Sequence, residues 1–91
     1  MTSEMEEKHT GHFLKISGEI SNLKKKEFEQ TIRFVFNQMP PECLERNLAA
    51  DVYNDSLYHF FTLWTDEKSL VKFIETDEYQ LIKGAYSALA H

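Results

Sequence analysis

The clearest pattern along the chain is a run of apolar and aromatic residues that leads into a helical stripe. Residues 57–64, LYHFFTLW, are almost all apolar or aromatic, which predicts a strand buried on both faces. Thr65 or Asp66 can then cap a helix in which apolar residues recur at helical spacing. The stripe consists of Leu70, Phe73, Ile74, Leu81, Ile82, Ala85 and Leu89. The sequence therefore predicts a strand followed directly by an amphipathic helix.

The first part of the chain shows the same succession. Residues 12–20, HFLKISGEI, alternate between apolar and polar and predict a strand. A helix is predicted over 23–39, with Ser21 or Asn22 as its cap and two consecutive prolines to end it. A strand that feeds a helix thus opens the domain.

Two strands are predicted to form a hairpin in the middle of the chain. After a linker at 42–45, residues 46–54 alternate as a strand, and the turn residues at 54–56 join them to the strand at 57–64. The order strand, helix, strand, strand, helix indicates an α+β fold, with both helices on one face of a mostly antiparallel sheet.

The sheet face without helices is predicted to carry aromatic and polar side chains, because strand residues alternate between two sides. We expect this face to hold Phe13, Lys15, Ser17, Glu19, Ala49, Asp51, Tyr53, Tyr58, Phe60, Thr62 and Trp64. The other side of the third strand, with Phe61 and Leu63, would then pack on the second helix. Such a face suits a ligand cavity or a dimer interface. The cavity candidates are Trp64, Tyr58, Phe60, Tyr53, Asp51 and Glu19.

Length and composition limit the number of domains, the kinds of partner and the cellular compartment that fit this chain. The 91 residues make one domain, with residues 1–11 as a mobile acidic tail and 12–91 as the folded part, and so small a core favours association. The net charge of -5 argues against a nucleic-acid partner, and no apolar run is long enough to span a membrane. The single cysteine, Cys43, fits a cytoplasmic protein without disulfides. His9 and His12 have no further ligand beside them, so no metal site is predicted.

Three features together resemble a known family. The aromatic strand ending in Trp64, the turn TDEKSL, and a helix broken near Thr76 and Asp77 and resumed as EYQLIKGAYSAL are similar to the antibiotic-biosynthesis-monooxygenase-like group. The resemblance covers residues 12 to 90. It implies a ferredoxin-like fold, pairing as a dimeric α/β barrel, and a cavity bordered by Trp64.

The chain departs from this family in two respects. Members that degrade haem use a histidine on the second helix and an asparagine on the first strand, whereas residues 66–90 contain no histidine and residues 12–20 no asparagine. Haem degradation is therefore disfavoured. The last strand of the family is also missing after the second helix, so this edge is either absent or filled by a partner chain or by the N-terminal tail.

Two function classes remain from the sequence. In the first, implied by the resemblance, the chain is a cofactor-free monooxygenase that acts on small phenolic or quinol-like compounds. In the second, it is a non-catalytic small-molecule-binding or interaction protein of the same fold. Both predict a homodimer formed through the uncovered sheet face. A small aromatic compound is the candidate ligand in the first, whereas in the second the same side chains serve for packing. No catalytic residue is assigned, because no nucleophile with its base is visible in the pattern.

Overall fold

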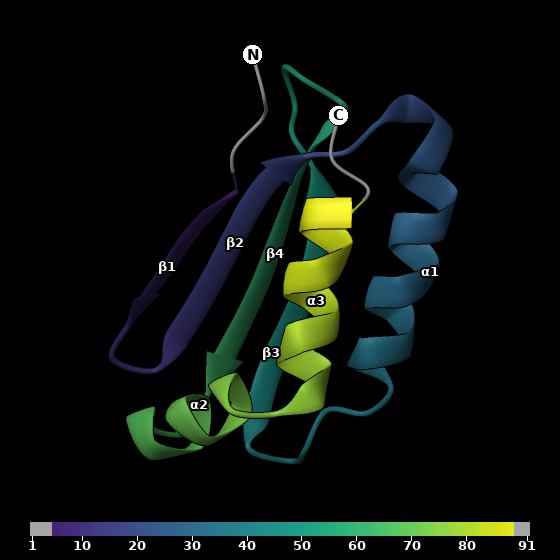
Figure 1. The fold of residues 1–91 in the computed structure, drawn as a ribbon. Coiled ribbons are helices and arrows are strands. Elements are labelled where there is room, and N and C mark those ends of the chain that lie inside the picture. Colours follow the sequence, from purple (N-terminus) through teal and green to yellow (C-terminus); the bar gives the residue numbers. More distant parts are fainter. Residues whose placement is uncertain (1–4, 89–91) are drawn as a thin grey trace.

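A computed structural model describes residues 5–88 of the chain. Its sheet has four antiparallel strands in the order β1-β2-β4-β3 (Figure 1). The strands are β1 (Glu6–Thr10), β2 (Phe13–Glu19), β3 (Cys43–Ala50) and β4 (Leu57–Trp64). The bounds of β4 agree with the prediction, whereas β3 begins three residues earlier because the expected linker already pairs with β4 through a bulge between Cys43 and Glu45.

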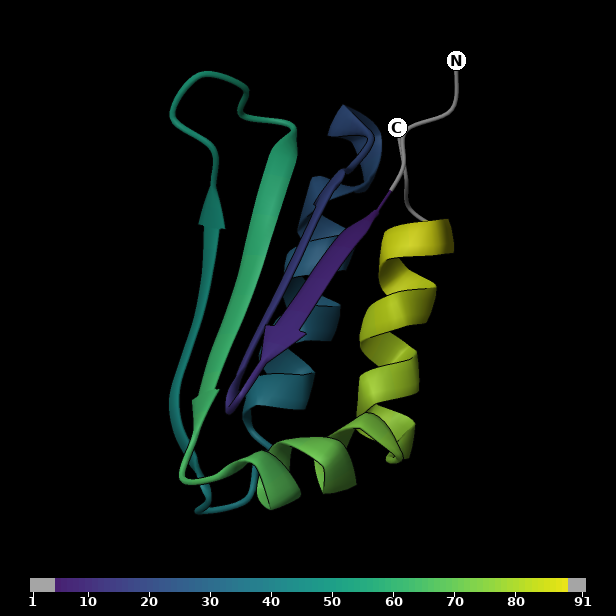
Figure 2. The ribbon, with the colours of Figure 1, turned by 90° about the vertical axis from the view of Figure 1, so that its left-hand side faces the viewer.

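The helices cover one face of this sheet. A single 3₁₀ turn, η1 (Asn22–Lys24), leads into α1 (Lys25–Phe36), and the second predicted helix is divided into α2 (Glu67–Ile74) and α3 (Asp77–Ala88). Figures 1 and 2 show α1 and α3 on the same side of the sheet, while α2 crosses the end where β4 finishes. At the break, the Thr76 hydroxyl accepts a hydrogen bond from the Tyr79 N–H at 3.2 Å, which caps α3. The predicted α+β, ferredoxin-like fold is confirmed.

The edge beside β2 is filled by the N-terminal segment. The sequence prediction made residues 1–11 a mobile tail and left the fourth strand missing, but residues 6–10 form β1 and pair with β2 along their whole length. The low hydrophobicity of residues 1–11 suggested a tail, but β1 is held by backbone hydrogen bonds to β2 and by the side chain of Glu7. Glu7 accepts hydrogen bonds from the Tyr79 hydroxyl at 2.6 Å and the Lys83 ammonium at 3.2 Å, both on α3. Of the alternatives left open for this edge, the N-terminal segment is the one that fills it.

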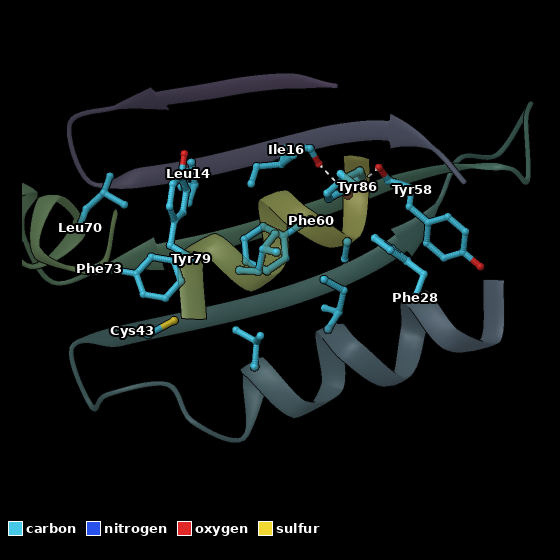
Figure 3. Close-up of a cluster of buried hydrophobic side chains, with 14 of the residues drawn as sticks. Leu14, Ile16, Phe28, Cys43, Tyr58, Phe60, Leu70, Phe73, Tyr79 and Tyr86 are labelled. Atoms are coloured by element: carbon cyan, nitrogen blue, oxygen red, sulfur yellow. Dashed lines mark hydrogen bonds between the residues drawn. The ribbon is translucent and has the colours of Figure 1, made fainter. Parts of the chain in front are cut away.

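The helix-covered face contains the core. On β4 the buried side chains are Tyr58, Phe60, Thr62 and Trp64, which meet α1, α2 and α3 (Figure 3). This reverses the predicted sides of β4, because Phe61 and Leu63 point to the bare face and do not pack under the second helix. The sides of β2 are as predicted, with Leu14 and Ile16 buried.

The bare sheet face is defined by the strand register. Residues paired across neighbouring strands lie on the same face of the sheet. One row of the bare face contains Glu6, Ser17, His59 and Ala49, and the next row contains Lys8, Lys15, Phe61 and Asn47. Phe13, Leu63 and Glu45 lie beyond the second row, and Glu19 and Leu57 lie beyond the first. Phe13, Leu57, Phe61 and Leu63 are half-buried, and the Phe13 and Phe61 rings lie 5.6 Å apart. Among residues 5–88, no helix is long and apolar enough to cross a membrane.

Candidate functional site

A cavity of about 390 Å³ lies where the end of β4 meets α2. Trp64 is the last residue of β4, and Asp66 caps α2 directly after it by accepting a hydrogen bond from the Ser69 N–H at 2.8 Å. The chain therefore turns sharply and leaves a hollow that the α1–β3 connection closes on the other side. The lining residues are Gln38, Pro40, Glu42, Trp64, Lys68, Ser69, Lys72, Phe73, Thr76 and Glu78. This hollow is called the Trp64 cavity below.

The floor of the Trp64 cavity is aromatic. The rings of Trp64 and Phe73 lie 4.9 Å apart, with Phe73 4% exposed and Trp64 without solvent-exposed surface. The indole N–H of Trp64 donates to the Thr62 hydroxyl at 2.9 Å, so this donor is already used. Because Trp64 is fully buried, a ligand in the cavity would reach Phe73 first and would not stack on the indole ring.

The rim of the Trp64 cavity is charged. Lys68 and Lys72 lie four residues apart on α2 and so share one helix side, and Glu42 and Glu78 come from the α1–β3 connection and the first turn of α3. Within the described residues, neither lysine forms a salt bridge. An apolar floor below cationic side chains suits a flat organic molecule that carries a phenol or another acidic group.

Two of the predicted cavity residues lie under α1 instead. The Tyr58 ring packs edge-on against Phe28 at 5.2 Å, and Phe60 stacks on Phe36 at 5.6 Å. The Tyr58 hydroxyl donates to Glu29 at 2.5 Å. Burial, reinforced by the Glu29 carboxylate, raises the pKa of Tyr58 to about 12, so its phenol is protonated at neutral pH.

The bare sheet face holds a serine, a histidine and an aspartate in hydrogen-bond contact. His59 Nδ1 lies 2.8 Å from the Ser17 hydroxyl, and His59 Nε2 lies 2.9 Å from Asp51 Oδ1. The hydrogen bond from His59, followed by that from the Tyr53 N–H, lowers the pKa of Asp51, so Asp51 is ionised and accepts a hydrogen bond from His59 Nε2.

This Ser17–His59–Asp51 cluster has the contacts of a nucleophile, a base and an orienting carboxylate. Ser17, however, lies inside β2 between β1 and β4, where strand pairing uses the neighbouring N–H groups that an oxyanion site would need. None of the four main cavities among the described residues is lined by all three side chains. We therefore interpret the cluster as a satisfied polar network that joins β2, β4 and the β3–β4 turn.

The six predicted cavity residues do not share one cavity. Trp64 borders the Trp64 cavity, whereas Tyr58 lines a separate groove and Phe60 is fully buried. Glu19 is half-buried on the bare face. Asp51 and Tyr53 lie in the β3–β4 turn, where Asp51 binds His59 and Tyr53 is 97% exposed. The prediction failed because both sides of β4 are apolar, so alternation grouped its residues correctly but could not tell which group the helices cover.

Sequence analysis missed most of the residues that line the Trp64 cavity. Phe73 was assigned only to the core stripe, and Lys68 and Lys72 were not considered. Their spacing of four on the helix directly after Trp64 was the available signal. Among the residues that the structure describes, no group of three histidine, cysteine or carboxylate side chains could hold a metal ion.

Comparison with known proteins gives matches in structure only. No family model matches the chain. No curated protein matches it either. Among solved structures, a conserved protein from Methanosarcina mazei Go1 has a TM-score of 0.77 at 17% identity, over 88% of this chain and 81% of that one. A protein from Caulobacter crescentus CB15, described as a "putative antibiotic biosynthesis monooxygenase", has a TM-score of 0.75 at 17% identity, over 88% and 78%.

A third solved structure agrees with these two. The protein from Bacteroides thetaiotaomicron VPI-5482, described as of unknown function and a "possible oxidoreductase", has a TM-score of 0.76 at 9% identity, over 92% of each chain. The chain thus has the fold of antibiotic-biosynthesis-monooxygenase-like proteins, and the resemblance predicted from the sequence is confirmed at the level of the fold.

Proposed function

We propose that the Trp64 cavity binds a small phenolic or quinol-like compound and that the protein oxidises this compound with O₂ without a bound cofactor. The observation that carries the proposal is the aromatic floor of Trp64 and Phe73 beneath the lysine-bearing rim. Support comes from the fold, which is shared with a protein described as a "putative antibiotic biosynthesis monooxygenase" and with one of unknown function described as a "possible oxidoreductase".

The proposed reaction balances with O₂ as the only oxidant. A phenol whose para carbon carries hydrogen gains one oxygen atom there, the second oxygen atom leaves as water, and the product is a para-quinone. The phenolate form gives up electrons most readily. Lys68 and Lys72 would favour that form, because a nearby opposite charge lowers the pKa of a phenol. The carboxylates Glu42 and Glu78 on the same rim are candidate acceptors for the phenol proton.

Fluorescence of the single tryptophan and oxygen uptake together test this function. We expect phenols and quinols from a small panel to quench or shift the Trp64 emission saturably, and at least one of them to be consumed with one O₂ per molecule. The double variant Lys68→Gln/Lys72→Gln should slow oxygen uptake, whereas Lys26→Gln, an exposed lysine on α1, serves as the control. Binding without oxygen uptake would refute the oxidation and leave the non-catalytic binding protein. If no compound binds, the cavity is not a phenol site.

We also propose that the protein is a homodimer formed through the bare sheet face. Phe13, Phe61, Leu57 and Leu63 give this face a half-buried apolar centre that no helix covers. A domain of this size gains stability from such association. The Ser17–His59–Asp51 cluster satisfies its own hydrogen bonds, so a partner could cover it without stranding a polar group.

Charges at the edges of the bare face favour a second copy as the partner. Lys8 and Lys15 pair across the β1–β2 edge, Glu6 and Glu19 lie on the same two strands further from them, and Glu45 lies on β3 at the opposite edge. A twofold axis parallel to the strands would bring Lys8 and Lys15 of one protomer over β3, with its Glu45, of the other.

The mass in solution tests the dimer. Light scattering at micromolar concentration should give twice the chain mass, and Phe61→Glu on the bare face should give the monomer mass. Val71→Glu is the matched control, because Val71 is 49% exposed on α2 and lies outside the proposed interface. A monomer mass for the unmodified chain would overturn the proposal.

A further inference from the structure

The chain contains two arginines, Arg33 and Arg46, and both line the same groove. This second cavity has a volume of about 400 Å³ and lies between α1 and β3, separate from the Trp64 cavity. From this convergence we propose that the groove is a binding site for a small organic monocarboxylate with an apolar body.

The fold brings the two arginines to one place from different elements. On β3, Arg46 pairs in register with Thr62, a buried residue of the helix-covered face, so Arg46 lies on the helix side of this edge strand. On α1, Arg33 follows Glu29 by four residues, and Glu29 reaches the Tyr58 hydroxyl at 2.5 Å. Residues four positions apart lie on the same side of a helix, so Arg33, like Glu29, lies on the side of α1 that borders the groove.

The groove also has an apolar part. Ile32 is fully buried, and Phe36 and Leu48 are partly buried against the core. Phe36 is itself held by its stacking on Phe60 at 5.6 Å. The groove thus offers hydrocarbon and aromatic surface for the body of a ligand, beside cationic groups for its head.

The charges of the groove match a monoanion. Two guanidinium groups face one carboxylate, that of Glu29, which leaves an excess of one positive charge in a chain whose net charge is -5. Among the described residues neither arginine forms a salt bridge, and Glu29 already accepts the Tyr58 hydroxyl. A guanidinium binds a carboxylate through two parallel hydrogen bonds, which a lysine cannot do. A phosphate dianion would exceed the available positive charge.

The presence of just two arginines makes the test direct. In a nitrogen-15-labelled sample of the full chain, the side-chain Nε–H groups of Arg33 and Arg46 give two arginine resonances, which we would follow during titration with cyclohexanecarboxylate. We expect both resonances and the amides of 46–50 to shift saturably at millimolar ligand. Arg33→Gln and Arg46→Gln should each weaken binding about tenfold, which corresponds to about 1.4 kcal/mol. Both arginines are exposed, so the variants should keep the wild-type spectrum elsewhere.

Three comparisons can overturn the proposal. Cyclohexanecarboxamide has the same shape without the charge and should not bind, so equal binding of the amide would contradict carboxylate recognition. Lys26→Gln removes a positive charge from α1 outside the groove and should leave binding unchanged; a loss as large as for the arginine variants would mean non-specific attraction. Shifts confined to the Trp64 indole would place the carboxylate in the other cavity. Because each cavity has its own reporter, failure here is distinguishable from failure of the proposed oxidation.

Discussion

Gly18 and Gly84 should respond to the same substitution with opposite signs. Gly18 lies buried in β2, and a Cβ at this position would come within 2.8 Å of Cδ1 and 3.1 Å of Cε1 of Tyr86. The Tyr86 ring cannot retreat, because it packs on Phe28 at 4.9 Å and its hydroxyl donates to the backbone carbonyls of Ile16 and Tyr58 (Figure 3). Gly84, on α3, has no heavy atom within 4 Å of the added Cβ.

The magnitudes follow from two opposing effects. Replacing glycine by alanine reduces the entropy of the unfolded chain and stabilises by about 0.4–1 kcal/mol where the backbone allows it. Overpacking a filled site costs about 1–3 kcal/mol. Neither glycine has a positive φ, so the clash decides the sign. We expect Gly18→Ala to lower the free energy of unfolding by about 1–2 kcal/mol and Gly84→Ala to raise it by about 0.5–1 kcal/mol.

Urea unfolding at one fixed protein concentration measures both effects. A third variant isolates the clash: in a Tyr86→Leu background, Gly18→Ala should lose most of its cost, because the ring that meets the Cβ is gone. If Gly18→Ala stabilises the chain as much as Gly84→Ala does, Tyr86 does not occupy the space above β2 and the docking of α3 is wrong.

Three further predictions concern packing and titration. Phe73→Ala should cost about 3–5 kcal/mol in urea unfolding, whereas Val71→Ala, at a half-exposed position on the same helix, should change stability by about 0.5 kcal/mol or less. The hydrogen bond from the Ser69 N–H lowers the pKa of Asp66, so the ionised Asp66 cap stabilises the fold above about pH 4 and this contribution is lost as the pH falls. In Asp66→Asn, the melting temperature should therefore depend less on pH in the acid range than in the unmodified chain. Burial raises the pKa of the Tyr58 hydroxyl to about 12, so the protonated Tyr58 favours the folded state below about pH 10 and this contribution is lost as the pH rises toward 12. In an absorbance titration, Glu29→Gln should lower the pKa of Tyr58, while burial keeps it above about 10.

The element order and most boundaries followed from the sequence because they depend on local signals. Alternation at 12–20 and the apolar run at 57–64 each have a direct physical cause in side-chain direction, whereas the break near Thr76 was expected only from the family resemblance. The first strand did not follow, because β1 is polar and is held by pairing with β2 and by the contacts of Glu7 with α3. The partners of Glu7 on α3 are 72 and 76 residues away in sequence, beyond any local pattern.

The candidate site was predicted in one respect and not in others. Trp64, which the sequence suggested as a cavity residue, lines the hollow at the point where β4 ends and the chain turns into α2. The side of β4 was wrong, because Phe61 and Leu63 are as apolar as Phe60 and Trp64, and only the docking of α1 and α3 selects the buried set. The contact of Asp51 with His59 depends on the β3–β4 register, which the predicted hairpin placed too late in the chain.

The indole N–H resonance of Trp64 provides the most direct test of the central claim. The chain has one tryptophan, so one indole cross-peak reports on the cavity, and its hydrogen bond to Thr62 at 2.9 Å keeps that proton observable. Titration with the phenol that shows oxygen uptake should move this peak and the amides of Lys68, Lys72 and Phe73 along one saturation curve, while the two arginine side-chain resonances stay in place. If the compound is oxidised and the indole peak does not move, the chemistry takes place elsewhere and the Trp64 cavity is not the active site.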